Sequence, residues 1–317
     1  MRVFVAGASG AIGKPLIRQL VAAGHAVTGM TRRDAAAQEI RGAGAEAVVC
    51  DVFDRPALED AIARAQPDVV VHQLTSLPDV FDFRDKNLYT ATNRVRTEGT
   101  RNLVAAARAV EARRFVSQSI AFVYEPTGDW VKAEDAPLMH DAPAPFGEAL
   151  EALYDMERQV LQADALDGLV LRYGFFYGRG TAYAPDGYFA REVRRRRFPI
   201  VGSGDGVTSF IHVEDAAGAT VAAVERGAPG IYNVCDDEPT PGREWIPVYA
   251  QAMGAKRPFR VPKFIARLTA GPAAVTLTAT LRGASNAKAK RELDWQPRYP
   301  SWRRGFADAV GRVSVPA

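Results

Sequence analysis

Apolar segments alternate with amphipathic segments along the first half of the chain. The apolar segments cover residues 3–6, 25–31, 45–50, 68–72, 114–119 and 169–173. The amphipathic segments cover residues 12–23, 34–41, 55–65, 88–110 and 146–163. Apolar strands that alternate with helices are typical of a parallel sheet covered by helices on both faces. The pattern therefore predicts an α/β fold with a Rossmann-type, doubly wound parallel sheet, whose ligand lies at the carboxyl ends of the strands.

The pattern changes after Gly174. Short predicted strands and helices follow, separated by many Gly and Pro residues. We therefore predict a nucleotide-binding domain over residues 1–174 and a smaller C-terminal substrate-binding lobe over residues 175–317. Residues 230–234 form an apolar run that we expect to return to the main sheet as a further strand.

The first strand and the first helix are joined by the sequence GASGAIG, residues 7–13. Gly7 allows a tight turn, Gly10 has no Cβ and lets a pyrophosphate approach the backbone, and Gly13 lets the helix pack closely on the strand. The unpaired N–H groups of the first helical turn favour an anion. The strand, turn and helix in this order indicate a dinucleotide site, the alternative being a tight turn that binds no ligand.

The composition limits which kinds of binding partner are expected. The chain has 317 residues, of which 47% are hydrophobic, enough for one large domain or two fused ones. Its net charge of +3 gives no reason to expect a nucleic acid, so we expect a small-molecule substrate. Cys50 and Cys235 are too few for a disulfide framework or a metal site, and they fit a reducing cytoplasm.

Two segments bear on localisation. The first predicted strand begins at residue 3, which leaves no room for a signal peptide. Residues 264–281 are fairly apolar, but Arg267, Pro272 and several threonines interrupt them, so we expect no membrane span. We expect instead a helix packed on the lobe or a self-association surface, which would allow a homodimer. The prediction is a cytoplasmic protein.

Six motifs together resemble the extended (atypical) short-chain dehydrogenase/reductase family, the group of NAD-dependent epimerases and dehydratases. They are GASGAIG (7–13), CDVFD (50–54), EGTRNLVAAA (98–107), FVSQSIAFVY (115–124), LRYGFFYGRG (171–180) and SFIHVEDAA (209–217). The resemblance covers essentially the whole chain. It implies an NAD(P)-binding Rossmann domain and an enzyme that acts as an oxidoreductase or epimerase.

The resemblance also implies a set of cofactor contacts at the carboxyl edge of the sheet. They are Gly7, Ser9, Gly10, Ala11, Ile12, Gly13, Arg32, Arg33, Asp51, Val52, Leu74, Thr75, Ser117, Tyr173 and Phe175. Asp51 and Val52 resemble the family's adenine contacts.

The end of the second predicted strand bears on the choice between NAD and NADP. In this fold an acidic residue there binds the ribose 2′-hydroxyl and selects NAD, whereas an arginine accommodates the 2′-phosphate of NADP. Arg32 and Arg33 occupy this point, and no acid precedes Asp34. Because arginine–phosphate contacts are charge-assisted, we predict NADP (NADPH) over NAD. The alternative is two solvated arginines at the start of a helix.

The acid–base residues depart from the family pattern. The resemblance implies a Tyr that donates a proton and a Lys four residues later that lowers its pKa. Phe146 and Leu150 occupy these two positions, and Phe146 lies at close to the family's separation from Arg172. Tyr154 is too close to Arg172 for the pattern. It stays a candidate for a displaced proton donor, against the alternative of a helix residue that packs on the lobe.

The resemblance further implies a Ser or Thr that orients the substrate. Ser119 is the candidate, although it lies one residue further from Tyr124 than the family pattern has it. The alternative for Ser119 is a satisfied polar group at the end of a strand.

The substrate is expected to be small and apolar or ring-shaped. Thr208 stands where family members that act on nucleotide sugars place an arginine for the diphosphate. Residues 173–177, YGFFY, are expected to line the space beside the nicotinamide with aromatic rings. We predict an NADP-dependent enzyme that transfers hydride on a hydroxyl or carbonyl. The alternatives are a non-catalytic NADP(H)-binding sensor or regulatory protein, and a sugar-nucleotide epimerase or dehydratase.

Overall fold

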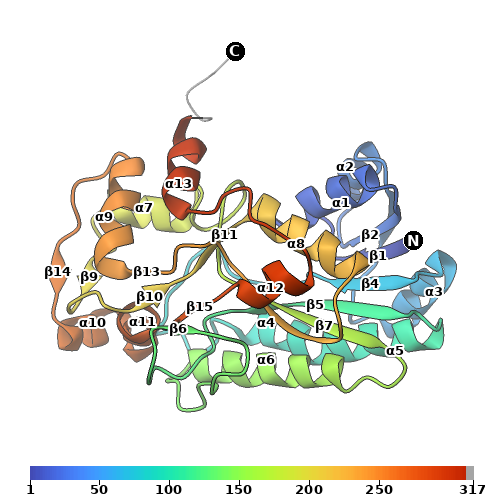
Figure 1. Ribbon diagram of the computed structural model, residues 1–317, viewed down its shortest axis with the longest axis horizontal. Coiled ribbons are helices and arrows are strands. Elements are labelled where there is room, and N and C mark those ends of the chain that lie inside the picture. The colour runs from blue at the N-terminus through green and yellow to red at the C-terminus, as the bar shows by residue number, and fades with distance from the viewer. Residues whose placement is uncertain (312–317) are drawn as a thin grey trace.

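A seven-stranded sheet forms the centre of the computed structural model, which describes residues 1–311 and side chains up to residue 308 (Figure 1). All neighbouring strands are parallel, in the order β12-β7-β5-β4-β1-β2-β3. The strands are β1 (Arg2–Ala6), β2 (Ala26–Thr31), β3 (Glu46–Val49), β4 (Val69–His72), β5 (Arg114–Ile120), β7 (Asp167–Tyr173) and β12 (Gly230–Val234). The predicted doubly wound sheet is confirmed, and residues 230–234 return to it beside β7.

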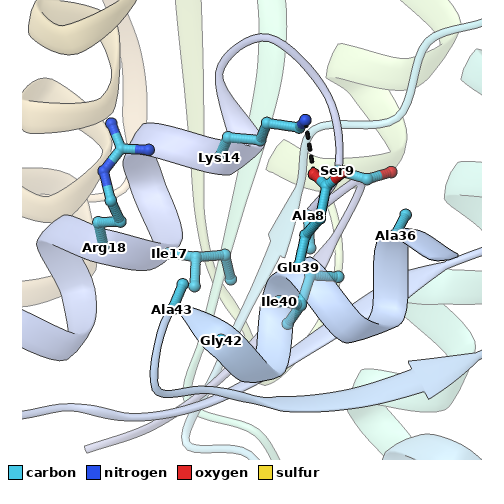
Figure 2. A pocket seen from close by; sticks show the side chains of 10 residues that line it. All are labelled: Ala8, Ser9, Lys14, Ile17, Arg18, Ala36, Glu39, Ile40, Gly42 and Ala43. Carbon is cyan, nitrogen blue, oxygen red and sulfur yellow. Dashed lines mark ion pairs between the residues drawn. The ribbon is translucent and has the colours of Figure 1, made fainter.

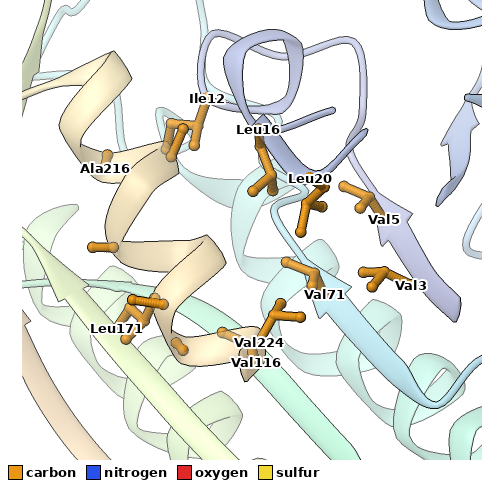
Figure 3. Packing of buried hydrophobic residues seen from close by; sticks show 14 of the residues in the cluster. Val3, Val5, Ile12, Leu16, Leu20, Val71, Val116, Leu171, Ala216 and Val224 are labelled. Carbon is orange, nitrogen blue, oxygen red and sulfur yellow. The ribbon is translucent and has the colours of Figure 1, made fainter. Parts of the chain in front are cut away.

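Helices cover both faces of this sheet (Figure 1). One face carries α1 (Gly13–Ala22), α2 (Asp34–Gly42) and α8 (Val213–Glu225), and the other carries α3 (Arg55–Ala65), α5 (Thr100–Ala109) and α6 (Phe146–Leu161). Figure 3 shows Val3 and Val5 of β1 packed with Leu16 of α1 and with α8. The intervening Phe4 points into the core on the opposite face. Burial on both faces explains why the strands are apolar throughout.

The segment predicted as one helix over residues 88–110 is interrupted. It consists of α4 (Thr90–Arg94), a π-helical turn η1 (Val95–Gly99) and α5. The Thr97 hydroxyl donates to the Asn93 carbonyl at 3.0 Å, and such side-chain bonds compete with the regular helical ladder. Single π-turns within helices are frequent at functional sites.

The remaining helices and strands lie outside the central sheet. They are β6 (Val131–Lys132), β8 (Phe175–Tyr177), α7 (Tyr188–Arg194), β9 (Ile200–Val201), β10 (Val207–Thr208), β11 (Phe210–His212), β13 (Thr240–Pro241), α9 (Gly242–Ala252), β14 (Arg260–Val261), α10 (Lys263–Ala270), α11 (Pro272–Val275), η2 (Thr276–Thr280), β15 (Gly283–Ala284), α12 (Ala287–Glu292) and α13 (Trp302–Gly311). Phe210 lies at the centre of an aromatic core, 5.1 Å from the Trp245 ring and 5.3 Å from the Phe306 ring. This core holds α9 and α13 against β11.

The apolar segment over residues 264–281 folds as α10, α11 and η2 rather than as one long helix. Phe264 and Leu268 of α10 are exposed. Within the described part of the chain, the helices are all too short or too polar to span a bilayer.

Candidate active site

The glycine turn lies at the carboxyl end of β1, where the strand order reverses between β1 and β4. Gly7 has a φ of +95°, and a Cβ there would lie 2.6 Å from the Gln73 carbonyl oxygen. A Cβ on Gly13 would lie 2.2 Å from the Gly7 carbonyl oxygen. No side chain caps the N-terminus of α1, and Gly10 is exposed. The Lys14 and Leu16 N–H groups already donate to the Gly10 and Ile12 carbonyls, and residue 15 is a proline. The N–H groups of residues 11–13, which have no backbone partner within the described part of the chain, are therefore those available to an anion.

Arg32 and Arg33 lie on the neighbouring edge, directly after β2. Both side chains are exposed, and neither forms an ion pair within the described part of the chain. The Ser9 hydroxyl lies 3.2 Å from the Thr31 hydroxyl, which joins the glycine turn to the end of β2. The two guanidinium groups are thus free to bind a phosphate beside the glycine turn.

A pocket of about 280 Å³ lies between α1 and α2, next to this edge (Figure 2). Ser9 and Ala8 line it from the glycine turn. Lys14 Nζ forms an ion pair with Glu39 Oε2 at 2.6 Å across it, as Figure 2 shows. Lys14 is a further cation near the predicted 2′-phosphate position, and Glu39 neutralises it.

The other predicted cofactor residues differ in how they can reach a ligand. Ala11, Asp51, Leu74, Thr75 and Phe175 are partly or fully exposed, whereas Ile12 and Val52 are buried. Ser117 and Tyr173 are fully buried, and the Tyr173 hydroxyl lies 2.6 Å from the Thr220 hydroxyl. Contact of Ser117 or Tyr173 with a cofactor would therefore involve their backbone.

The inward face of α6 carries no proton donor along its first three turns. Its residues there are Phe146, Ala149, Leu150, Leu153 and Met156, and all five are buried. The position that matches the family's Ser or Thr spacing from Tyr124 holds Ile120, which is also apolar. The place where the family resemblance implies a Tyr, a Lys and a hydroxyl is therefore apolar throughout.

Ser119 does not present its hydroxyl to a ligand. It is 1% exposed, and its Oγ donates to Glu157 Oε1 at 2.7 Å. Glu157 also accepts from Arg172 Nε at 2.8 Å and from Nη2 at 2.6 Å. The expectation that Ser119 orients the substrate needs correction, because this hydroxyl is taken up by a buried ion pair between α6 and β7.

The Tyr154 hydroxyl is held by the backbone of the loop between β5 and α6. It donates to the Met139 carbonyl at 2.8 Å and lies 3.3 Å from the Val123 carbonyl. Burial raises the pKa of Tyr154 well above its usual range. A role as displaced proton donor stays a prediction, and the contacts are those of a residue that anchors the loop.

The aromatic residues around β8 divide between the cores and a ring stack. The expectation that Tyr173 and Tyr177 line the cleft is wrong, since both side chains are fully buried. Phe175 stacks on Phe122 with ring centroids 4.0 Å apart and an interplanar angle of 12°. Phe122 in turn lies 6.5 Å from Phe146, at 16°. These three nearly parallel rings, here named the ring stack, adjoin the apolar face of α6 and suit a planar ligand.

The structure offers neither a cation for a diphosphate at Thr208 nor, among the described residues, a set of metal ligands. Thr208 is buried, and its hydroxyl accepts from Trp245 Nε1 at 3.1 Å, so it offers no charge to a diphosphate. Among the residues that the structure describes, no cluster of three or more His, Cys, Asp or Glu side chains could hold a metal ion.

Comparison with known proteins agrees with this geometry. The model of the NAD dependent epimerase/dehydratase family matches residues 3–235. The chain is 47% identical over 307 residues to a 3-diazoavenalumate denitrifying reductase from a Streptomyces species, covering 96% of this chain and 99% of that one. It is 27% identical to a 2-alkyl-3-oxoalkanoate reductase from Stenotrophomonas maltophilia, covering 99% of this chain and 96% of that one.

Solved structures show the same fold at lower identity. UDP-glucose 4-epimerase from Thermotoga maritima superposes with a TM-score of 0.76 at 20% identity, covering 99% of this chain and 98% of that one. A dTDP-glucose 4,6-dehydratase from Streptomyces venezuelae, solved with NAD, superposes with a TM-score of 0.76 at 21% identity, covering 98% and 96%. At these identities the likeness establishes the architecture alone.

Proposed function

The chain belongs to the NAD dependent epimerase/dehydratase family, and we propose that within it the protein is an NADP(H)-dependent reductase of a small aromatic molecule whose reduction takes up no proton from a side chain. The coarser assignment, an NAD(P)-dependent oxidoreductase, rests on the family and on the similar reductases. The single observation that carries the finer proposal is the apolar inward face of α6.

Different electrophiles make different demands on an enzyme. A ketone takes up a hydride and a proton, so its reduction benefits from a positioned acid. A diazonium ion takes up the hydride alone: a C–H bond forms, and the C–N bonding pair leaves with N₂. When bound, the reduced nicotinamide supplies this hydride. A site without a Tyr–Lys pair therefore suits the second reaction.

Two observations support an aromatic diazonium ion, the cationic form of a diazo compound, as the substrate class. The relative at 47% identity is named for a diazo compound and for the loss of nitrogen from it. Phe122 and Phe175, the partly exposed members of the ring stack, offer apolar ring surface to an aromatic ligand. Leu150 also removes the positive charge that a lysine would place beside a cationic diazonium group, which would otherwise repel it.

The reaction can be tested with matched electrophiles. We expect NADPH to be oxidised with an aryl diazonium carboxylate at least a hundredfold faster than with the corresponding aryl ketone, because no general acid assists the ketone. With NADPH deuterated at C4, deuterium should appear on the ring carbon that loses N₂. Heat-denatured protein controls for direct reduction by NADPH. Ketone reduction at a comparable rate would refute the proposal, and binding of NADPH without any oxidation would support the sensor alternative.

The preference for NADP(H) has its own test at Arg32. Replacing Arg32 by Ala should weaken NADPH binding by roughly ten- to a hundredfold, because a hydrogen bond between charged groups is lost. NADH binding should barely change. Arg41→Ala, at the other end of α2, is the matched control and should leave both affinities unchanged. Titration of NADPH and NADH by fluorescence measures the effect, and tighter binding of NADH than of NADPH by the unaltered protein would contradict it.

A further inference from the structure

Arg96 lies in the π-turn η1 and is 8% exposed. Its Nη1 donates to the Ala149 carbonyl at 3.3 Å and to Asn93 Oδ1 at 3.5 Å. Ala149 immediately precedes Leu150, the position at which the family places its lysine. The guanidinium therefore lies directly behind the apolar part of the site.

Arg96 is a buried cation that lacks an acidic partner. Within the described part of the chain it forms no ion pair. The titratable groups that face it are His72 and Tyr89, and both are neutral at neutral pH: burial beside Arg96 lowers the pKa of His72 to about 4, and burial raises the pKa of Tyr89 to about 12. An uncompensated charge in the interior is costly, so a partner from outside the chain would stabilise it.

The other two buried arginines have more hydrogen-bond partners than Arg96, although the Nε of Arg114 also lacks one within the described part of the chain. Arg172 makes a two-fold ion pair with Glu157. Arg114 donates to three backbone carbonyls, those of Ala223, Arg226 and Gly227. Arg96 alone among the three has only two long contacts, both from Nη1.

Arg96 also lies near the carboxyl ends of the central strands, where the predicted cofactor contacts lie. His72, which Arg96 faces, ends β4 at its carboxyl end, and Leu74 and Thr75 follow it directly. On the other side, Ala149 lies less than one helical turn from Phe146 of the ring stack, about 4.5 Å along the helix axis. For a ligand beside Phe122 and Phe175, the partly exposed members of the ring stack, Arg96 is the buried cation reached along α6, past Phe146.

We propose that Arg96 binds the carboxylate of the substrate, a subsite that rests on the proposed reductase function. The geometry of a guanidinium matches a carboxylate through two parallel hydrogen bonds. The substrate class is thus an aromatic carboxylate, with its ring at the ring stack and its anionic end at η1. Arg96 does not act as a proton donor. It positions the substrate, and the substrate carboxylate supplies the negative charge that no residue of the described chain places beside Arg96.

The test measures binding rather than turnover. We compare 4-hydroxycinnamate with its methyl ester by calorimetry on NADP⁺-loaded protein. The unaltered protein should bind the acid at least tenfold more tightly than the ester, because the ester lacks the charge. Arg96→Gln should reduce this preference to about twofold, and Arg96→Lys should retain part of it. Arg94→Gln, an exposed arginine of the adjoining turn that pairs with Glu98, is the matched control and should keep the full preference.

Several outcomes would overturn this assignment. They are equal binding of acid and ester, no saturable binding of either, or an unchanged preference in Arg96→Gln. Weaker NADP⁺ binding in Arg96→Gln with the acid preference intact would place Arg96 at the cofactor instead. If Arg96→Gln does not fold, as judged by thermal unfolding, Arg96→Lys decides between the same outcomes. Failure of the reductase proposal would look different: the carboxylate would bind through Arg96, but no diazonium compound would oxidise NADPH.

Discussion

Replacement of Glu157 by Gln is expected to lower the free energy of unfolding by about 3–5 kcal/mol. Glu157 is 4% exposed and is the anionic partner of Arg172, which is 1% exposed. Removing one charge of a buried pair leaves the other uncompensated in the interior, and this penalty is larger than the loss of the hydrogen bonds themselves. Urea unfolding followed by circular dichroism measures the change.

Two companion variants identify the cause. Glu148→Gln removes a carboxylate from the exposed side of the same helix and should change the stability by no more than about 0.5 kcal/mol. Adding Arg172→Met to Glu157→Gln removes the stranded charge and should recover a large part of the loss. An equal loss in Glu157→Gln and Glu148→Gln would show that the buried pair does not have the importance we assign to it.

Asp236→Asn is expected to stabilise the protein, and to do so more strongly as the pH rises. Asp236 follows β12, is 1% exposed, and has an Oδ2 atom without a hydrogen-bond partner within the described part of the chain. Burial raises the pKa of Asp236 to about 8, against 3.8 for the ordinary carboxyl. The folded state therefore keeps a proton that the unfolded state releases, and stability is lost as the pH rises from about 4 to about 8.

An asparagine does not titrate, so the advantage of Asp236→Asn should grow by up to about 1.4 kcal/mol per pH unit in this range. Urea unfolding at pH 5, 6.5 and 8 measures it. Asp237→Asn is the control: this neighbouring carboxylate pairs with Lys290 at 3.0 Å, and its loss should slightly destabilise the protein. A gain from Asp236→Asn that is the same at pH 5 and pH 8 would contradict the assignment.

The central sheet could be predicted from the sequence because burial acts on whole elements. Every strand of a doubly wound sheet is covered on both faces, so segments such as residues 68–72 are apolar without interruption. The glycine turn could be predicted too, because the close contact of Gly13 with the Gly7 carbonyl excludes any side chain. Both signals are local, and both were confirmed.

The orientation of single side chains was harder to predict. Tyr173 shares a face of β7 with Leu169 and Leu171, and this alternation turns it into the core beneath α8 rather than into the cleft. Arg172 points to the opposite face, where it pairs with Glu157 of α6. The Ser119 hydroxyl donates to the same carboxylate. The alternation was visible in the sequence, but the identity of the partner on α6 depends on how the helix packs.

Arg96 was missed entirely. It stands in the predicted helix over residues 88–110 with three other arginines, Arg94, Arg101 and Arg108, and nothing local distinguishes a buried arginine from a solvated one. Its burial follows from the π-turn and from the approach of α6, which is distant in sequence. By contrast, the presence of Phe146 and Leu150 at the family's Tyr and Lys positions is read from residues at a fixed spacing, and the lack of a Tyr–Lys pair that it implies stays a prediction.

The pairing of β6 with β15 has a consequence for the order in which the molecule assembles. Residues 131–132 pair in parallel with residues 283–284, so the loop that holds Phe122 and anchors Tyr154 is closed by a late part of the chain. During synthesis the amino-terminal strands emerge first and can associate early, whereas this pair must wait until the ribosome has released residue 284. Long-range closures of this kind are slow. The strands that carry the glycine turn are therefore synthesised well before the pairing that closes the loop around Phe122 can form.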